Sequence, residues 1–186
     1  MRVPLSVNNE LMLVLGGARS GKSGFAVRYI EDHYHSYLYL ASAEIGDPEM
    51  AERVKHHRQE RGPQWGLVEE PLEIAQALGN RCDGVEAVLV DCLTLWLSNV
   101  LLQKGEEAVP NYRQELIGAL KTRNRAIVLV SNEVGLGIVP ETHLGREFRD
   151  LAGRLNQEVA ALADKVVFTV AGLPMVVKGG SSADVL

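Results

Sequence analysis

The chain has 186 residues, 46% of them hydrophobic and 23% charged, with a formal net charge of −5 at pH 7. This composition excludes a disordered, collagen-like or coiled-coil protein, and the acidic balance argues against a general binder of nucleic acid or lipid surfaces. No apolar run reaches the roughly 18 residues that a membrane span needs, and the two cysteines lack a CxxC spacing, so we expect them to be reduced. We expect a cytoplasmic protein with one domain over residues 1–186, including an N-terminal extension at 1–10 and a flexible tail at 179–186.

Short apolar runs alternate with segments of helical periodicity along the chain. Strands are predicted at 11–15, 37–42, 67–69, 87–91, 126–131, 166–170 and 175–177, and helices at 23–32, 47–61, 72–78, 93–101, 110–123 and 143–162. The fourth helix repeats apolar residues at i, i+3, i+4, i+7 and i+8, namely Leu93, Trp96, Leu97, Val100 and Leu101. The last helix, capped by Thr142, carries the stripe Leu144, Phe148, Leu151, Leu155, Val159 and Leu162. Apolar strands alternating with helices predict a mostly parallel sheet covered on both faces, and a turn at 172–174 makes its last pair an antiparallel edge.

A phosphate-binding motif directly follows the first predicted strand. The run GGARSGKS at residues 16–23 fits the pattern G-x-x-x-x-G-K-[ST], and the strand before it and the helix after it are the context that the motif requires. Its glycines let several backbone N–H groups face one anion, while Lys22 supplies a charge for the β and γ phosphates and Ser23 a hydroxyl to Mg²⁺. We expect an α/β P-loop nucleoside-triphosphatase fold of RecA-like type, with nucleotide contacts from Gly16, Gly17, Ala18, Arg19, Ser20, Gly21, Lys22 and Ser23.

Asp91 ends a predicted buried strand, where an acid in a nucleoside-triphosphate site holds Mg²⁺ directly or through water. The alternative is a polar strand end or a helix N-cap. Cys92 stands where many hydrolytic motors carry the glutamate that activates water, which favours transfer to an acceptor over hydrolysis. Glu133, after the next strand, could compensate for that missing glutamate.

Two adjacent histidines, His56 and His57, lie in the predicted helix 47–61. Neighbouring residues on a helix do not point at one metal from one face, so the pair does not indicate a metal site. A neutral imidazole can instead attack phosphorus and carry a phosphoryl or nucleotidyl group, with Lys55, Arg58 and Arg61 nearby to neutralise a triphosphate. Spacing alone favours the plainer interpretation, a solvated basic helix face with one packed histidine.

Five segments together resemble the bifunctional adenosylcobinamide kinase / adenosylcobinamide-phosphate guanylyltransferase family of cobalamin biosynthesis. They are GGARSGKS at 16–23, YLASA at 39–43 with EMAERVKHHR at 49–58, VDCLTLWLSN at 90–99, SNEVGLGIVP at 131–140 and FRDLAGRLNQ at 148–157. The resemblance runs from about residue 11 to 178, and the histidine helix combined with NEVGLGIVP is much more specific than the phosphate loop. The chain departs from the family in its ten or so residues before the first strand and in having aspartate where the family can have glutamate, at Asp91.

The resemblance implies two reactions in one enzyme. A nucleoside triphosphate, ATP or GTP, phosphorylates the aminopropanol hydroxyl of adenosylcobinamide. GTP then guanylylates a histidine that matches His56, and GMP passes to adenosylcobinamide phosphate. The implied catalytic residues are His56 and Lys22, with Mg²⁺ at Ser23 and Asp91. Nucleotide contacts beyond the phosphate loop are implied for Ala41, Ser42, Ala43, His57, Arg58, Gln59, Glu60, Glu69 and Asp91.

A corrinoid substrate and a homotrimer with its active sites near subunit boundaries are further implications of the resemblance. The loop 132–140 is expected at the carboxyl edge of the sheet, where it borders the corrinoid or a neighbouring subunit or is simply a glycine-rich structural turn. Two other functions stay open. One is a plain P-loop kinase of small molecules without a covalent nucleotide, and the other is a non-catalytic RecA-like nucleotide-binding protein.

Overall fold

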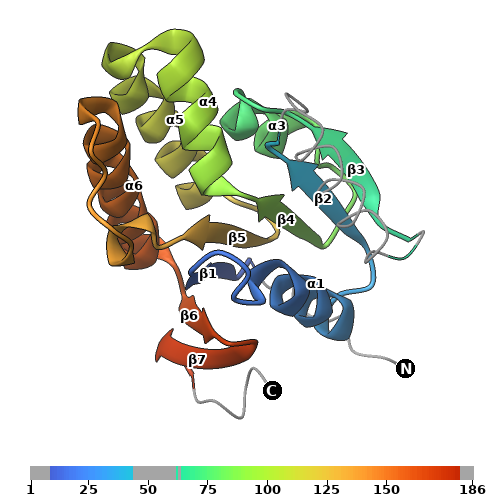
Figure 1. The fold of residues 1–186 in the computed structure, drawn as a ribbon. Helices are drawn as coiled ribbons and strands as arrows, with labels where there is room; N and C mark the ends of the chain where they lie inside the picture. Colours follow the sequence, from blue (N-terminus) through green and yellow to red (C-terminus); the bar gives the residue numbers. More distant parts are fainter. Residues whose placement is uncertain (1–8, 44–61, 63, 181–186) are drawn as a thin grey trace, which may run out of the picture.

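A seven-stranded sheet forms the centre of the protein in a computed structural model that describes residues 9–43, 62 and 64–180 (Figure 1). Its strands are β1 Leu11–Gly16, β2 Tyr37–Ala41, β3 Gly66–Glu69, β4 Ala87–Asp91, β5 Ala126–Asn132, β6 Lys165–Val170 and β7 Leu173–Lys178. Their order across the sheet is β3-β2-β4-β5-β1-β6-β7, and every neighbouring pair is parallel except β6 with β7. The predicted mostly parallel sheet with an antiparallel edge is therefore confirmed.

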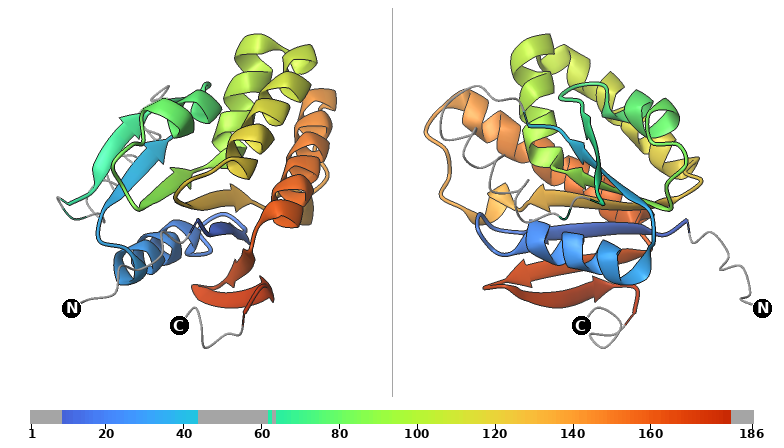
Figure 2. Two further views of the ribbon diagram at one scale, coloured as in Figure 1. Left: turned by 180° about the vertical axis from the view of Figure 1, so that it is seen from behind. Right: turned by 90° about the vertical axis from the view of Figure 1, so that its right-hand side faces the viewer.

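Helices cover both faces of this sheet, as predicted. The α-helices are α1 Lys22–His33, α3 Ile74–Asn80, α4 Leu93–Lys104, α5 Val109–Lys121 and α6 His143–Leu162, with short 3₁₀ turns η1 Glu106–Ala108 and η2 Val134–Leu136. Of these, α1 lies on one face, and α3 to α6 lie on the other (Figures 1 and 2). The helix predicted at 47–61 falls outside the described residues. Among those that are described, no helix combines the length and apolarity of a bilayer crossing.

The central strands are apolar on both sides because both faces of the sheet are covered. In β1, Met12 and Val14 face the cluster around α1, whereas Leu11, Leu13 and Leu15 face the cluster under α3 to α6. Successive side chains of a strand point to opposite faces, so a strand buried on both faces reads as a continuous hydrophobic run. The predicted stripe of α4 is buried in full, from Leu93 to Leu101.

Three local expectations need correction. The helix predicted from residue 72 begins at Ile74, because Glu70 Oε1 accepts hydrogen bonds from the N–H groups of Leu72 and Glu73 and holds a turn there. Of the predicted stripe of α6, only Leu155 and Val159 are buried, and Leu144 is 46% exposed. Thr142 does cap α6, since its Oγ1 accepts from the N–H of Gly145.

The third correction concerns the turn between the last two strands. The turn consists of Ala171 and Gly172, with φ of 51° and 82°, and not of residues 172–174. Positive φ at both central residues is typical of the two-residue turns whose twist matches that of paired strands. Leu173 and Pro174 belong to β7, where Pro174 lies opposite Thr169. Proline is tolerated there because β7 is an edge strand.

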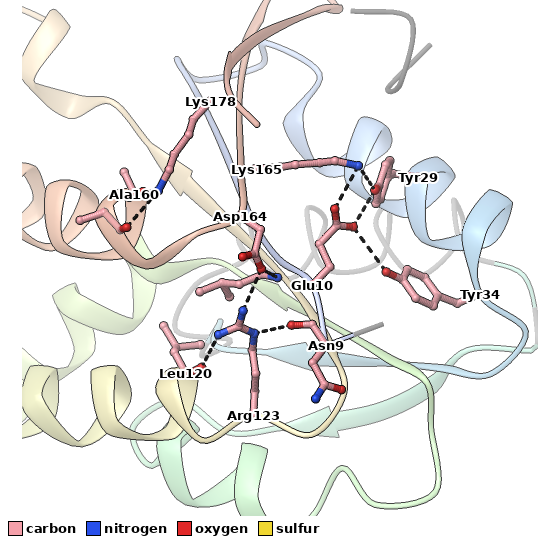
Figure 3. Close-up of polar contacts among 12 residues, drawn as sticks. Asn9, Glu10, Tyr29, Tyr34, Leu120, Arg123, Ala160, Asp164, Lys165 and Lys178 are labelled. Atoms are coloured by element: carbon pink, nitrogen blue, oxygen red, sulfur yellow. Dashed lines mark hydrogen bonds and ion pairs between the residues drawn. The ribbon is translucent and has the colours of Figure 1, made fainter. Parts of the chain in front are cut away.

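A polar network fixes the amino-terminal ends of β1 and β6 (Figure 3). Glu10 pairs with Lys165 at 3.0 Å and accepts a hydrogen bond from the hydroxyl of Tyr29 at 2.7 Å. Burial, with Glu10 close by, raises the pKa of Tyr34. Beside this group, Asp164 accepts from the N–H of Leu11 and from Arg123, both at 2.8 Å. These contacts hold the start of β1, whose other end carries the phosphate-binding motif.

Candidate functional site

The strand order makes the boundary between β1 and β5 a topological switch point at the carboxyl end of the sheet. After β1 the chain enters α1 on one face, whereas after β5 it enters α6 on the opposite face (Figure 2). Helices that diverge from adjacent parallel strands leave an opening above the strand ends, and open α/β sheets bind ligands at such a switch point. The register places Gly16 of β1 level with Asn132 of β5 at this opening.

The phosphate loop joins β1 to α1 at this switch point, in a conformation that depends on its glycines. Gly21 has φ of 95° and directly precedes α1, whose first N–H groups face the loop. A Cβ added to Gly16 would lie 2.6 Å from Ser20 Oγ and from two oxygens of Thr169. A side chain at Gly16 would therefore clash with Ser20 and Thr169, and a side chain at Gly21 would strain the backbone.

Lys22 turns back into the loop. Its side chain is buried, and its ammonium donates a hydrogen bond to the carbonyl of Gly17 at 2.6 Å. Burial lowers the pKa of Lys22, while the nearby Cys92 and Asp91 oppose that shift. The cation thus lies within the loop and near the end of β4, where a phosphate would offer it a stronger acceptor than a neutral carbonyl.

The β6–β7 hairpin braces the phosphate loop from the other side. Ser20 Oγ and Thr169 Oγ1 share a hydrogen bond of 2.7 Å, and the N–H of Gly172 donates to the carbonyl of Ser20 at 2.9 Å. A Cβ on Gly21 would lie 3.1 Å from the Cα of Gly172. The hairpin turn and the loop therefore pack backbone against backbone, 149 residues apart at the Ser20–Thr169 pair.

Asp91 is held at the end of β4 by a tyrosine. Tyr39, on the neighbouring β2, donates its hydroxyl hydrogen bond to Asp91 Oδ2 at 2.9 Å. Asp91 and Ser23 are only partly buried. A carboxylate and a hydroxyl are ligands that Mg²⁺ accepts alongside phosphate oxygens and water. No group of three or more His, Cys, Asp or Glu side chains suited to a metal occurs among the described residues.

Ser42 locks the backbone next to Asp91. Its hydroxyl donates to the carbonyl of Cys92 and accepts from the N–H of Cys92, both at 2.8 Å, and Ser42 is fully buried. Asn99 of α4 donates to the carbonyl of Ser42 at 2.8 Å. Burial raises the pKa of Cys92 to about 12, so this residue is a neutral thiol. The Ser42 side chain thus braces the strand ends and faces away from solvent.

A second polar chain runs from α4 through the end of β5 to α6. The N–H of Asn132 donates to Thr94 Oγ1 at 2.7 Å, and the N–H of Glu133 donates to the carbonyl of Gly16 at 3.1 Å. Asn156 of α6 donates from Nδ2 to the carbonyl of Asn132 at 3.1 Å and to Glu133 Oε1 at 2.8 Å. Glu133 is thereby tied to the first residue of the phosphate loop.

The remaining predicted site residues divide into two groups. Ala41 of β2 lies in register with Asp91 on one side and Glu69 of β3 on the other, so the ends of these strands and Ala43 form one edge with the phosphate loop. The predicted site residues His56, His57, Arg58, Gln59 and Glu60 lie outside the described residues.

Sequence reasoning missed three residues that position the site, Tyr39, Thr169 and Asn156. Each is a polar side chain at a position where the surrounding pattern is apolar: Tyr39 and Thr169 lie in buried strands, and Asn156 follows Leu155 on the core side of α6. Buried polar groups require partners, so such interruptions are a signal that could have identified them.

Two kinds of sequence comparison, with a family model and with individual proteins, point to the same family. A sequence model of the family described as cobinamide kinase / cobinamide phosphate guanyltransferase matches residues 12–177. The chain is 45% identical over 167 residues to the bifunctional adenosylcobalamin biosynthesis protein CobP of Pseudomonas aeruginosa, which covers 90% of this chain and 96% of that protein. It is 40% identical over 181 residues to the bifunctional adenosylcobalamin biosynthesis protein CobU of Escherichia coli K12, covering 90% and 99% of the two chains.

Among solved structures, the chain is similar to the ATPase EscN of the type III secretion system of enteropathogenic E. coli. The TM-score is 0.56 at 13% identity, over 89% of this chain and 44% of that one. Identity this low shows the fold alone. The α/β P-loop fold predicted from the sequence is confirmed.

Proposed function

The chain belongs to the cobinamide kinase / cobinamide phosphate guanyltransferase family, and we propose that it uses both activities in succession through a guanylyl-histidine intermediate. It first phosphorylates adenosylcobinamide with ATP or GTP. It then moves GMP from GTP onto adenosylcobinamide phosphate, giving adenosyl-GDP-cobinamide. The observation that carries this proposal is a complete phosphate loop in a chain that also contains the motif with His56.

The phosphate loop serves the first reaction. The backbone N–H groups of the loop and the start of α1 bind the phosphate oxygens, and Lys22 moves from the carbonyl of Gly17 to the β and γ phosphates. Ser23 and Asp91 would hold Mg²⁺, which would neutralise charge on the phosphates. Tyr39 keeps the carboxylate of Asp91 turned toward this position.

The second reaction uses the imidazole of His56 as nucleophile. A ring nitrogen attacks the α phosphorus of GTP, the bond from that phosphorus to the α–β bridging oxygen breaks, and pyrophosphate leaves. The phosphate of adenosylcobinamide phosphate then attacks the same phosphorus, and the P–N bond breaks to regenerate the imidazole. Dividing one displacement into two is the general use of a covalent intermediate.

The other expected contacts belong to the same proposal. Ala41, Ala43 and Glu69 lie at or next to the strand ends beside Asp91. The buried hydroxyl of Ser42 holds the backbone there through its hydrogen bond to the carbonyl of Cys92. His57, Arg58, Gln59 and Glu60 complete the nucleotide site from the histidine segment. One domain spanning 1–186 carries both reactions in the cytoplasm as a homotrimer, with a corrinoid and nucleotides as its ligands and no nucleic-acid partner.

Labelled GTP tests the intermediate. The protein is incubated with GTP carrying ³²P at the α phosphate, and the expected product is protein-bound label that is labile in acid and stable in base. His56→Ala should abolish the label, and His35→Ala, an exposed histidine in the turn before β2, should retain it. Label that survives His56→Ala would exclude this nucleophile. Transfer of the γ phosphate without any protein label would indicate a plain P-loop kinase.

A further inference from the structure

Phosphorylation of a hydroxyl requires a group that accepts its proton as the oxygen attacks phosphorus. The residue after Asp91, where a carboxylate could serve, is Cys92, which is buried and hydrogen-bonded through its backbone to Ser42. At the carboxyl ends of the strands, among the described residues, the carboxylates nearest to β1 in the strand order are Asp91 at the end of β4 and Glu133 just after β5. Asp91 already accepts from Tyr39 and is the proposed Mg²⁺ ligand, which leaves Glu133 for the acceptor side.

The backbone places Glu133 at the rim of the phosphate loop. β5 lies beside β1 in the sheet. Val130 of β5 is level with Asp91, the last residue of β4, and β5 continues for two more residues to Asn132, so Glu133 lies beyond the end of β4. The N–H of Glu133 donates to the carbonyl of Gly16, which is the first residue of the loop. Glu133 therefore lies beside the first residue of the loop, where the chain leaves β5 for α6, on the face of the sheet opposite α1.

The side chain of Glu133 is oriented but not neutralised. Asn156 is 4% exposed, and its Nδ2 donates to Glu133 Oε1 at 2.8 Å while it also holds the carbonyl of Asn132. In the part of the chain that the structure describes, no cation pairs with this carboxylate, and no hydrogen bond engages its second oxygen. A neutral amide donor fixes the direction of a carboxylate and leaves its charge without a cationic partner.

We infer that Glu133 is the general base of the phosphorylation step and that Asn156 is its positioning residue; this rests on the proposed kinase activity. The hydroxyl oxygen of the corrinoid's aminopropanol arm forms a bond to the γ phosphorus, and its proton passes to the free oxygen of Glu133. The bond between the γ phosphorus and the β–γ bridging oxygen breaks, and the nucleoside diphosphate leaves. The carboxylic acid returns its proton to water after product release.

Glu133→Gln is the decisive variant, because glutamine keeps the size of the side chain and an oxygen that can accept from Asn156. The full chain is assayed with adenosylcobinamide and ATP labelled at the γ phosphate, and the rate of adenosylcobinamide phosphate formation is measured. In parallel, GTP labelled at the α phosphate reports guanylylation of the protein, which needs no corrinoid hydroxyl. Glu141→Gln, an exposed carboxylate before α6, is the matched control.

Loss of a general base lowers rates by about 10²- to 10⁴-fold. We expect Glu133→Gln to lower kcat for phosphorylation at least about 100-fold, with the KM for ATP and the guanylyl label close to wild type, and Glu141→Gln to change neither. Asn156→Ala should lower kcat with an unchanged KM for ATP. Phosphorylation by Glu133→Gln within about tenfold of wild type, or an equal loss of both half-reactions, would overturn the inference. A wild-type chain that forms no adenosylcobinamide phosphate would instead refute the proposed function.

Discussion

Replacing Ser42 with alanine removes one buried hydrogen-bonded junction between the carboxyl ends of β2 and β4. The carbonyl of Cys92 would keep another donor, the N–H of Trp96 at 3.1 Å, but the N–H of Cys92 would lose its acceptor, the hydroxyl of Ser42. An unsatisfied buried donor costs about 1–3 kcal/mol. In a protein of this size each kcal/mol lowers Tm by about 2–4 °C, so Ser42→Ala should lower Tm by about 2–12 °C.

The chain contains a matched control at the other ends of the same two strands. Ser36 Oγ accepts from the N–H of Glu86 at 3.1 Å, again across 50 residues, but this hydrogen bond is exposed to solvent. Water replaces the serine there, so Ser36→Ala should change stability by no more than about 0.5 kcal/mol. Urea unfolding followed by circular dichroism measures both variants. If the two unfold at the same urea concentration, burial of the Ser42–Cys92 junction does not contribute as argued.

Two further predictions concern the loop and the thiol beside it. Gly21→Ala places a Cβ at φ of 95° and 3.1 Å from the Cα of Gly172, a strain of about 1–2 kcal/mol. Calorimetry should show that this variant binds GTP about tenfold more weakly. The control is Gly79→Ala near the end of α3, where an added Cβ meets nothing within 4 Å, and its GTP affinity should not change. Burial raises the pKa of Cys92 from 9.0 to about 12, so its thiol should not react with Ellman's reagent at pH 8 until the protein unfolds. The folded-state pKa of Cys92 is higher than its unfolded value, so the free energy of unfolding that it contributes is complete below pH 9. This contribution falls by up to about 1.4 kcal/mol per pH unit between pH 9 and 12. If the urea midpoint of Cys92→Ala falls over this pH range as much as that of the wild type, the prediction is contradicted.

Most elements could be predicted because their signals are local. The apolar runs of β1, β4 and β5 are buried on both faces of a parallel sheet, so each appears in the sequence as an uninterrupted strand. The start of α6 was predictable because Thr142 supplies its own cap. The errors occurred where a distant or unusual partner decides the outcome. Glu70 delays α3, and Ala171 takes the left-handed conformation that glycine usually provides.

The candidate site shows the same division. Lys22, Ser23 and Asp91 were predicted as site residues from a contiguous motif and from the end of an apolar strand, since these signals lie in neighbouring residues. Tyr39, Thr169 and Asn156 were not found, because each acts on a residue 52, 149 or 23 positions away. Which strands become neighbours determines those contacts, and no short pattern encodes the order β4-β5-β1-β6.

The amino-acid sequence by itself thus determined the alternation of strands and helices and the glycine-rich phosphate loop, because hydrophobic periodicity and glycine conformations depend only on residues close together in the chain. Only the folded sheet decided that a hairpin from the end of the chain supports that loop and that Glu133 stands at its rim. The physical reason is that side chains from separate strands meet only after the strands have taken their places beside one another.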